Sequence, residues 1–307
     1  MIPETACPSS QFMPSQTSHG VNDVTPIIQG SILGMGSSCF VSVDDGLTVL
    51  KGYEIWVDGK RRSYYARSCE EALRREELIY EKLGEHPRIL RCFGLKEVHT
   101  GVHSLRLELA PLGNVRQYIE DHAKEPLPER NQLQMALDIA VGLSYIHSQK
   151  VRHADLSCRN LFLFEGYRVK IGDFGGSVME GSGLAETVCE EMRYELPCRG
   201  REFRDRPVMK RELFALGSAI YEIMAWNRPF PALQDEEVEE RYAQDEFPSL
   251  DGITTSLTIR NCWNEVYETA DENIRQSSRL SDKLIIIQSD RTCYHMATLG
   301  HELVSIG

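Results

Sequence analysis

The sequence has no excess of positive charge and no apolar run long enough to cross a membrane. Its 34 Lys and Arg residues are outnumbered by 46 Asp and Glu residues, which gives a formal net charge of −12. Sequence-independent binding to DNA, RNA or an anionic membrane needs a basic face, and a membrane-spanning helix needs about 20 apolar residues. We therefore expect no nucleic-acid partner and no membrane partner.

The sequence also lacks any CxxC pair, although it contains nine cysteines. Its N-terminus does not have the charged-then-apolar pattern of a secretory signal. Scattered cysteines of this kind indicate reduced thiols, not a disulfide framework or a zinc site. We expect a soluble protein of the cytoplasm or the nucleus, and the sequence does not specify an oligomeric state.

Apolar periodicity divides the chain into a strand-rich first part and a helix-rich second part. Residues 1–24 are rich in Pro, Ser, Thr and Gln, which predicts a disordered tail. Residues 26–110 contain about five β-branched or apolar runs and one helical pattern, at 68–83. The prediction is an α+β protein with a small, mostly β lobe and a larger, mostly α lobe. Further helices are predicted at 127–149, from 211 onward, at 235–244 and at 256–274.

A glycine-containing stretch, "LGMGSSCFV" at 33–41, is the first candidate for chemistry. Gly34 and Gly36 carry no Cβ, so their backbone amides can approach a phosphate closely. A plain hairpin turn can also hold two glycines, and the motif alone leaves both readings open. The strand-like "CFVSV" that follows argues against a dinucleotide-binding unit, which needs a helix there, and no "GKS" or "GKT" is present.

Lys51 and Glu76 could form a second part of a phosphate site. Lys51 is at the end of an apolar strand, "TVLK", where its ammonium could meet phosphates under the glycine loop. Glu76 lies on the predicted helix at 68–83, and a Lys–Glu pair would keep the ammonium pointing at those phosphates. A lone Lys at the end of a strand is usually a surface residue, so the pair matters only in combination.

Two polar loops follow in the second half, "HADLSCRN" at 153–160 and "GDFG" at 172–175. Asp155 could accept the proton of an attacking hydroxyl, while Asn160 and Asp173 could ligate a metal ion that bridges phosphates. Asp and Asn are common in turns, so each residue alone is weak evidence. The glycine loop, Lys, Glu and both polar loops nevertheless occur in the order that phosphoryl transfer requires.

Together these stretches resemble a eukaryotic-type protein kinase domain. "LGMGSSCFV", "TVLK", "HADLSCRN" and "DFG" match its signature set, and "RELFALGSAIYEIMAWNRPF" resembles the central helix of its large lobe. The sequence style is similar to divergent kinase-like proteins of fungi. The resemblance implies a bilobal protein-kinase fold over 25–274, with lobes at about 25–110 and 111–274, and it assigns no role to the extension at 275–307.

The resemblance also implies cofactors and residue roles. The cofactors would be ATP and Mg²⁺ or Mn²⁺, and the partner a protein substrate. Lys51 and Glu76 would form the phosphate-orienting pair, with Asp155 as the base. The metal would be held by Asn160 and Asp173. The nucleotide would be covered by Gly34, Gly36 and Val41, with Leu107 as gatekeeper and the hinge at Glu108 to Ala110.

The sequence departs from the family pattern at four places that bear on scaffolding or regulation. Cys39 replaces the third glycine, and Ala154 replaces an Arg whose usual partner is a phosphorylated residue of the activation segment. Its absence predicts a segment that orders without phosphorylation. Cys198 replaces a Glu whose usual Arg partner, after "CW", is also absent, so that ion pair is lost as a whole. Glu212 stands where an Asp usually holds the catalytic loop.

All the residues expected to contact Mg·ATP or the hydroxyl are present, so the sequence favours an active kinase over a pseudokinase that only binds a nucleotide or a protein. After Asp155, Ser157 stands where Ser/Thr kinases usually have Lys, and Arg159 stands where many tyrosine kinases have Arg. Arg159 is therefore a further catalytic candidate. The remaining sequence resembles Ser/Thr members, so Ser/Thr specificity is favoured and tyrosine or dual specificity is the alternative.

Two charged runs remain. The acidic run "DEEVEE" at 235–240 is either a solvated helix face or a surface that attracts substrates with basic residues near the acceptor. The basic run "GKRRSYYARS" at 59–68 is interpreted as an exposed linker.

Overall fold

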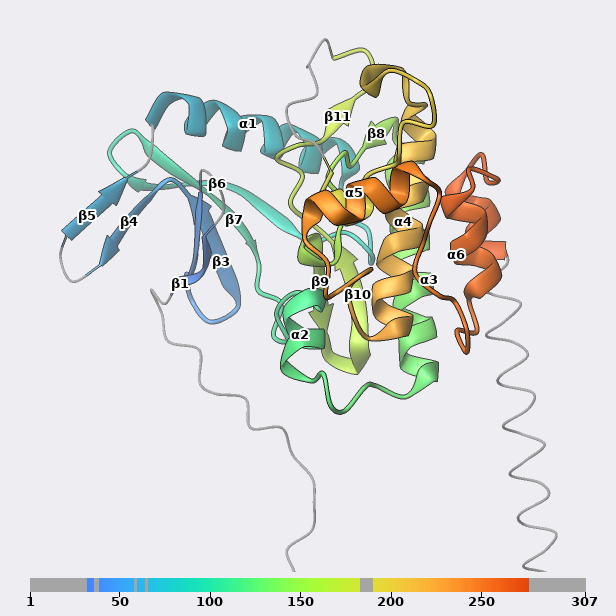
Figure 1. The fold of residues 1–307 in the computed structure, drawn as a ribbon. Helices are drawn as coiled ribbons and strands as arrows, with labels where there is room; N and C mark the ends of the chain where they lie inside the picture. Colours follow the sequence, from blue (N-terminus) through green and yellow to red (C-terminus); the bar gives the residue numbers. More distant parts are fainter. Residues whose placement is uncertain (1–31, 36–38, 58–59, 64–65, 183–189, 276–307) are drawn as a thin grey trace, which may run out of the picture.

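The computed structural model describes residues 32–35, 39–57, 60–63, 66–182 and 190–275, and within them the chain forms two lobes (Figure 1). The predicted tail at 1–24 and nearly all of the predicted extension at 275–307 lie outside the described residues. Within the described ranges, no helix combines the length and the apolar character that a membrane crossing requires.

The small lobe contains an antiparallel five-stranded sheet in the order β1-β2-β3-β7-β6. One helix, α1, packs against β6 and β7, because Leu73, Ile79 and Leu83 repeat at helical spacing and are buried. The bounds are β1 Ile32–Met35, β2 Phe40–Val43, β3 Thr48–Gly52, α1 Ala66–Leu83, β6 Cys92–His99 and β7 Val102–Glu108.

The run at 59–68 was interpreted from the sequence as an exposed linker, and this is wrong for residues 60–63, which form a strand. Strands β4 (Glu54–Val57) and β5 (Lys60–Ser63) pair as a separate antiparallel hairpin, which projects from the small lobe beside the main sheet (Figure 1). The Asp-Gly dipeptide at 58–59 is a common hairpin turn signal that the linker interpretation overlooked.

The large lobe is built around α3 and α4, which lie side by side in Figure 1. Helix α4 is buried on all sides from Arg211 to Ile223, as its nearly uniform apolar sequence predicts. The predicted single helix at 256–274 is wrong in its middle, because α6 ends at Trp263, a turn follows, and the chain is helical again only from 270 onward. The helices are α2 Val115–Asp121, α3 Glu129–Ser148, α4 Val208–Ala225, α5 Asp235–Ala243 and α6 Ser256–Trp263.

Two short strand pairs connect the helices to the cleft between the lobes. β9 (Leu161–Phe164) and β10 (Arg168–Ile171) form an antiparallel hairpin, and β8 (Val151–Arg152) pairs with β11 (Val178–Met179). Backbone hydrogen bonds from Leu90 to Ile171 and from Ile171 to Arg88 tie the small lobe to this layer. The buried apolar side chains form one continuous cluster across both lobes.

Candidate active site

The β9–β10 hairpin places the two proposed metal ligands next to each other. Its antiparallel register pairs Leu161 with Ile171, so the residues just outside the pair meet at the same end of the hairpin. The amide of Gly172 donates to the carbonyl of Asn160 at 3.0 Å. Asn160 and Asp173, which are 13 positions apart in sequence, are neighbours for this reason.

Lys51 connects the small lobe to this end of the hairpin. Its Nζ donates to Glu76 Oε2 at 2.7 Å and to Asp173 Oδ1 at 2.7 Å. The other oxygen of Glu76 accepts from the backbone amide of Phe174 at 3.1 Å. A strand, a helix and the "GDFG" loop thus meet at one ammonium group, and the contact between Lys51 and Glu76 that the sequence predicted is formed.

The charges of this cluster stabilise each other. Burial lowers the pKa of Lys51, but the carboxylates of Asp173 and Glu76 outweigh burial and raise it above its ordinary value. Burial raises the pKa of Asp173, and the charge and hydrogen bond of Lys51 bring it below its ordinary value. Lys51 is therefore an ammonium and Asp173 a carboxylate at neutral pH.

The polar loop at 153–160, the candidate catalytic loop, is held in place by contacts within it and with the "GDFG" loop. Asn160 Nδ2 donates to the backbone oxygen of Asp155 at 2.7 Å and to its Oδ2 at 3.1 Å. The ring of His153 packs against Phe174 at 5.2 Å between centroids and contacts the Gly172 carbonyl through Nε2 at 3.0 Å. Tyr80 of α1 also packs edge-on against Phe174, at 4.9 Å between ring centroids. These rings connect α1, "GDFG" and the catalytic loop into one packed unit.

A cavity of about 290 Å³ lies in the cleft beside this unit. A hollow of about 610 Å³ near the end of α1 is larger, but none of the motif residues line it. Of the predicted nucleotide contacts, Gly36 lies outside the described residues. The structure brings all the others together around the cleft cavity. The cleft cavity is lined on the small-lobe side by Gly34, Val41, Lys51, Leu107, Glu108 and Ala110, and on the other side by Arg159, Asn160, Phe162 and Asp173.

The donor atoms at the floor of the cavity fit a magnesium ion held jointly with phosphates. Because the amide nitrogen of Asn160 is engaged with Asp155, its Oδ1 is the atom that can ligate a cation. Asp173 uses Oδ1 for Lys51 and its side chain is 42 % exposed. Mg²⁺ is typically bound by one or two such oxygens together with substrate phosphates and water.

The family model for protein tyrosine and serine/threonine kinases matches residues 32–271, most of the chain. This chain belongs to the protein kinase family. The kinase is 28 % identical over 232 residues to the serine/threonine-protein kinase GIN4 of Saccharomyces cerevisiae, covering 74 % of this chain and 18 % of that protein. It is 26 % identical over 189 residues to the serine/threonine/tyrosine-protein kinase HT1 of Arabidopsis thaliana, covering 59 % of this chain and 47 % of that protein.

A third relative is the probable serine/threonine-protein kinase KCC4 of Saccharomyces cerevisiae, 34 % identical over 122 residues, or 39 % of this chain and 12 % of that protein. The chain spans less than half the length of each of these three relatives. The comparisons confirm the predicted family and the bilobal fold.

The kinase keeps a charged connection at the place where the usual ion pair is lost. Arg199 Nη1 and Arg201 Nη2, just after Cys198, donate to Glu265 Oε1 at 2.6 Å and 2.8 Å. The family's Glu–Arg pair itself is not formed, because Cys198 has no carboxylate, and a different ion pair joins the same two regions. The two regions are joined with the charges reversed, which a search for an Arg after "CW" could not find.

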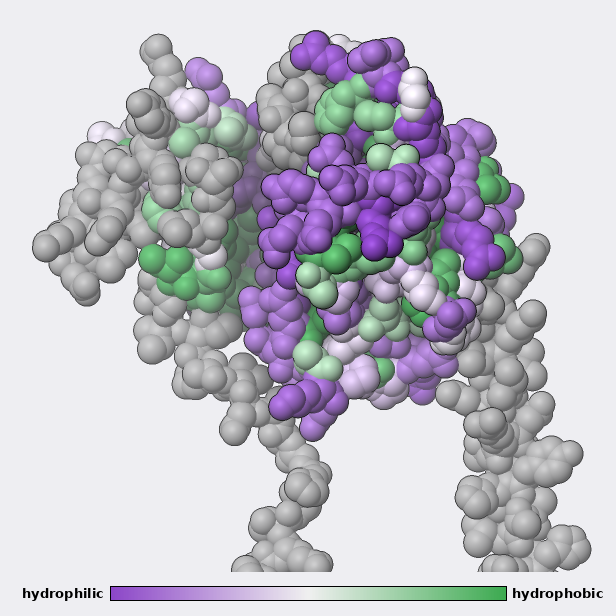
Figure 2. Space-filling model, in the orientation of Figure 1, coloured by the Kyte–Doolittle hydropathy of each residue, from purple (hydrophilic) through white to green (hydrophobic). Residues whose placement is uncertain are grey.

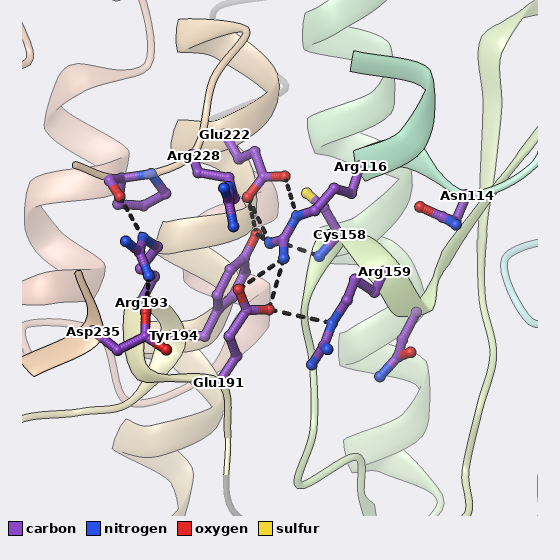
Figure 3. A network of polar contacts seen from close by, with 12 residues as sticks. Asn114, Arg116, Cys158, Arg159, Glu191, Arg193, Tyr194, Glu222, Arg228 and Asp235 are labelled. Carbon is purple, nitrogen blue, oxygen red and sulfur yellow. Dashed lines mark hydrogen bonds and ion pairs between the residues drawn. The ribbon is translucent and has the colours of Figure 1, made fainter. Parts of the chain in front are cut away.

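Sequence reasoning also missed a buried network around Arg116 of α2. Arg116 donates to both oxygens of Glu222 at 2.8 Å and to those of Glu191 at 2.7 and 2.8 Å (Figure 3). The available signal in the sequence was Glu222 itself, a carboxylate within the apolar run of α4, because a buried charge needs a partner.

Of the activation-segment residues with hydroxyls, Ser177 is buried and donates to the His153 carbonyl at 2.9 Å.

Proposed function

We propose that this kinase transfers the γ-phosphate of ATP to a hydroxyl of a protein substrate, with Ser or Thr favoured. The observation that carries the proposal is Lys51, whose ammonium lies at 2.7 Å from both Glu76 and Asp173. This geometry assembles residues from both lobes around one cavity. Phosphoryl transfer depends mainly on such positioning and on electrostatic stabilisation, because little covalent chemistry is left to the protein.

The residues of the cleft have separate roles in this proposal. Lys51 would hold the α- and β-phosphates, and Glu76 keeps its ammonium in place. Asp173 and Asn160 would hold Mg²⁺, which when bound neutralises the negative charge of the phosphates. Glu108 to Ala110 would offer backbone groups to the adenine, while Gly34 and Val41 would cover it.

Asp155 is the proposed base. The pKa of Asp155 is raised above the ordinary value of Asp. Burial is the largest cause and the charge of Asp173 adds to it, while the charge of His153 acts in the opposite direction. A raised pKa brings a carboxylate closer to the range in which it can accept a proton from a substrate. The two bonds from Asn160 fix the orientation of Asp155 toward the acceptor.

The favoured acceptor is Ser or Thr, with tyrosine as the alternative. Ser157 is buried, so it cannot take the place of the Lys that Ser/Thr kinases use, and Arg159 is exposed at the cavity. The names of the relatives support Ser/Thr transfer, and one of them also names tyrosine. A peptide mixture with Ser, Thr and Tyr acceptors, followed by phosphoamino-acid analysis, decides between them.

We further propose that substrates carry basic residues near the acceptor. Asp235, Glu236 and Glu237 form the acidic first turn of α5, and Glu239 and Glu240 continue this exposed face. Figure 2 shows a largely hydrophilic surface over this part of the large lobe. Complementary charge would speed the encounter. Peptides with Arg or Lys near the acceptor should be preferred by the wild type and lose this preference with Glu236→Gln and Glu239→Gln combined.

The thiols support a proposal for the compartment. Cys92, Cys158, Cys198 and Cys262 are free thiols. Free thiols suit a reducing environment, so we place the kinase in the cytoplasm or the nucleus.

The central experiment compares phosphate transfer from radiolabelled ATP to a mixed peptide library by the wild type and by Asp155→Asn and Lys51→Met. The wild type should incorporate phosphate, and both variants should lose it by about a hundredfold or more. Equal incorporation by the wild type and Asp155→Asn would contradict the proposal. A nucleotide-dependent rise in melting temperature without transfer would favour a pseudokinase.

A further inference from the structure

The carboxylate of Glu191 lies between two arginines from different parts of the large lobe (Figure 3). Its two oxygens accept from Arg116 Nη1 at 2.7 and 2.8 Å, and Oε2 is also 3.3 Å from Arg159 Nε. Arg116 belongs to α2, while Arg159 belongs to the short 3-10 helix Cys158–Asn160 of the catalytic loop. Glu191 itself precedes the turn Met192–Tyr194 in the activation segment.

The Arg116 side of this contact is rigid. Arg116 is buried and also holds Glu222 through two hydrogen bonds, and its Nη2 donates to the hydroxyl of Tyr194 at 3.2 Å. That hydroxyl in turn donates to Glu222 at 2.6 Å. The network holds two carboxylates and two guanidinium groups, so its charges balance, and buried charges are tolerated when they are paired in this way. The four groups belong to Glu191, Glu222, Arg116 and Arg159. The position of Glu191 is therefore set by the lobe itself.

The Arg159 side faces the cavity. The side chain of Arg159 is 55 % exposed, and it lines the cleft together with Asn160 and Asp173. A long side chain with this exposure would sample many rotamers unless an anchor limited them. Glu191 is the carboxylate that pairs with it among the described residues. The guanidinium is thus held at the edge of the cleft by a residue of the activation segment.

The contact between Glu191 and Arg159 is more important because the chain has Ala154 in the same loop. Ala154 cannot reach the activation segment, since it has only a methyl group and is buried. The link between catalytic loop and segment instead uses Glu191 with Arg159, the amide of Cys158 with the Tyr194 hydroxyl at 3.3 Å, and Ser177 with the His153 carbonyl.

We propose that Glu191 is a positioning residue for the transfer: held by Arg116, it fixes Arg159 at the cleft and anchors the activation segment without phosphorylation. This rests on the proposed function, since Arg159 matters only if phosphate is transferred. Glu191 does not contact the nucleotide cavity and acts through Arg159.

A double-mutant cycle tests the positioning role. Glu191→Gln keeps the shape and removes the charge, and Arg159→Met removes the guanidinium. Each should lower kcat about tenfold, while the KM for ATP changes less than about twofold because Lys51 and the hinge are unaffected. The double variant should be no slower than Arg159→Met, because Glu191 acts through Arg159. If the fold-changes in kcat of the two single variants multiply in the double variant, the proposal is overturned.

Glu190→Gln is the matched control. Glu190 precedes Glu191 and also pairs with an arginine, Arg211, at 2.7 Å, but it does not contact Arg159. Any effect of Glu190→Gln should multiply with that of Arg159→Met. If it shows the same non-additivity as Glu191→Gln, general loosening of the segment explains both and the specific role of Glu191 is wrong.

Two further readouts separate this proposal from the proposed function. Amide hydrogen exchange of peptides covering 156–160 and 190–196 should be faster in Glu191→Gln than in Glu190→Gln, even if the wild type transfers no phosphate; equal rates would contradict the anchoring role. Treatment of the active wild type with a nonspecific protein phosphatase should leave its kcat unchanged. A large loss after this treatment would show that the segment needs phosphorylation.

Discussion

Glu212 holds the backbone of Ala154 in a left-handed conformation. Glu212 Oε1 accepts from the amide of Ala154 at 2.8 Å, and Oε2 accepts from the amide of His153 at 2.9 Å. The φ angle of Ala154 is 63°, a conformation that costs a residue with a Cβ about 1–2 kcal/mol. The buried carboxylate offsets this cost and sets the loop geometry immediately before Asp155, so the extra methylene relative to Asp is accommodated.

Replacing Glu212 with Gln should destabilise the kinase by about 2–4 kcal/mol. Gln can accept from one of the two amides, but its NH2 group then faces the other, which leaves a buried donor without a partner. Urea unfolding followed by tryptophan fluorescence measures the change. Glu212→Asp should lose less because it keeps the carboxylate, and Glu239→Gln on the exposed face of α5 should change stability by less than about 0.5 kcal/mol. Equal stability of Glu212→Gln and wild type would contradict the anchoring role.

The same residue predicts a pH dependence. Burial raises the pKa of Glu212, but hydrogen bonding and charge from His147, the charge of His153 and the Ala154 amide bring it down from 4.5 to about 2. Because the folded-state pKa is below the unfolded one, this stabilisation is complete above about pH 4.5 and is lost as the pH falls toward 2.

The stability gap between wild type and Glu212→Gln should therefore shrink by about 2 kcal/mol from pH 7 to pH 3. Gln does not titrate, so the variant corrects for the other carboxylates that both proteins share. Unfolding curves at both pH values provide the comparison. A gap that is constant over this range would show that the pKa of Glu212 is not lowered in the folded protein.

The reversed ion pair at the end of the activation segment should contribute more than an exposed pair. Hydrogen bonds from Arg201 lower the pKa of Glu265 and those from Arg199 add to this, against the effect of burial, to about 2. The side chain of Glu265 is 16 % exposed, whereas Glu246, which pairs with Arg241, is 51 % exposed. Glu265→Gln should cost about 1–2 kcal/mol and Glu246→Gln less than about 1 kcal/mol. Equal costs in thermal or urea unfolding would contradict this.

Much of the site was predictable because its motifs are local. The glycine loop, "TVLK", "HADLSCRN" and "DFG" can each be recognised from a few neighbouring residues. They also occur in the order that phosphoryl transfer requires. Residues whose role depends on a distant partner were harder. Glu212 was expected to hold the loop, but nothing near Glu191 or Glu265 in the sequence points to Arg116 or to Arg199.

The sequence alone determined the family, the two-lobed architecture and the placement of Lys51, Asp155, Asn160 and Asp173, because apolar periodicity and motif spacing act over short distances along the chain. Only the tertiary structure decided how the large lobe compensates for Ala154 and Cys198. Those solutions join residues 24 to 106 positions apart, such as Ser177 with His153 and Arg116 with Glu222. Charges brought into the interior must be balanced by whichever partners the packed helices place beside them, and that choice is made in three dimensions.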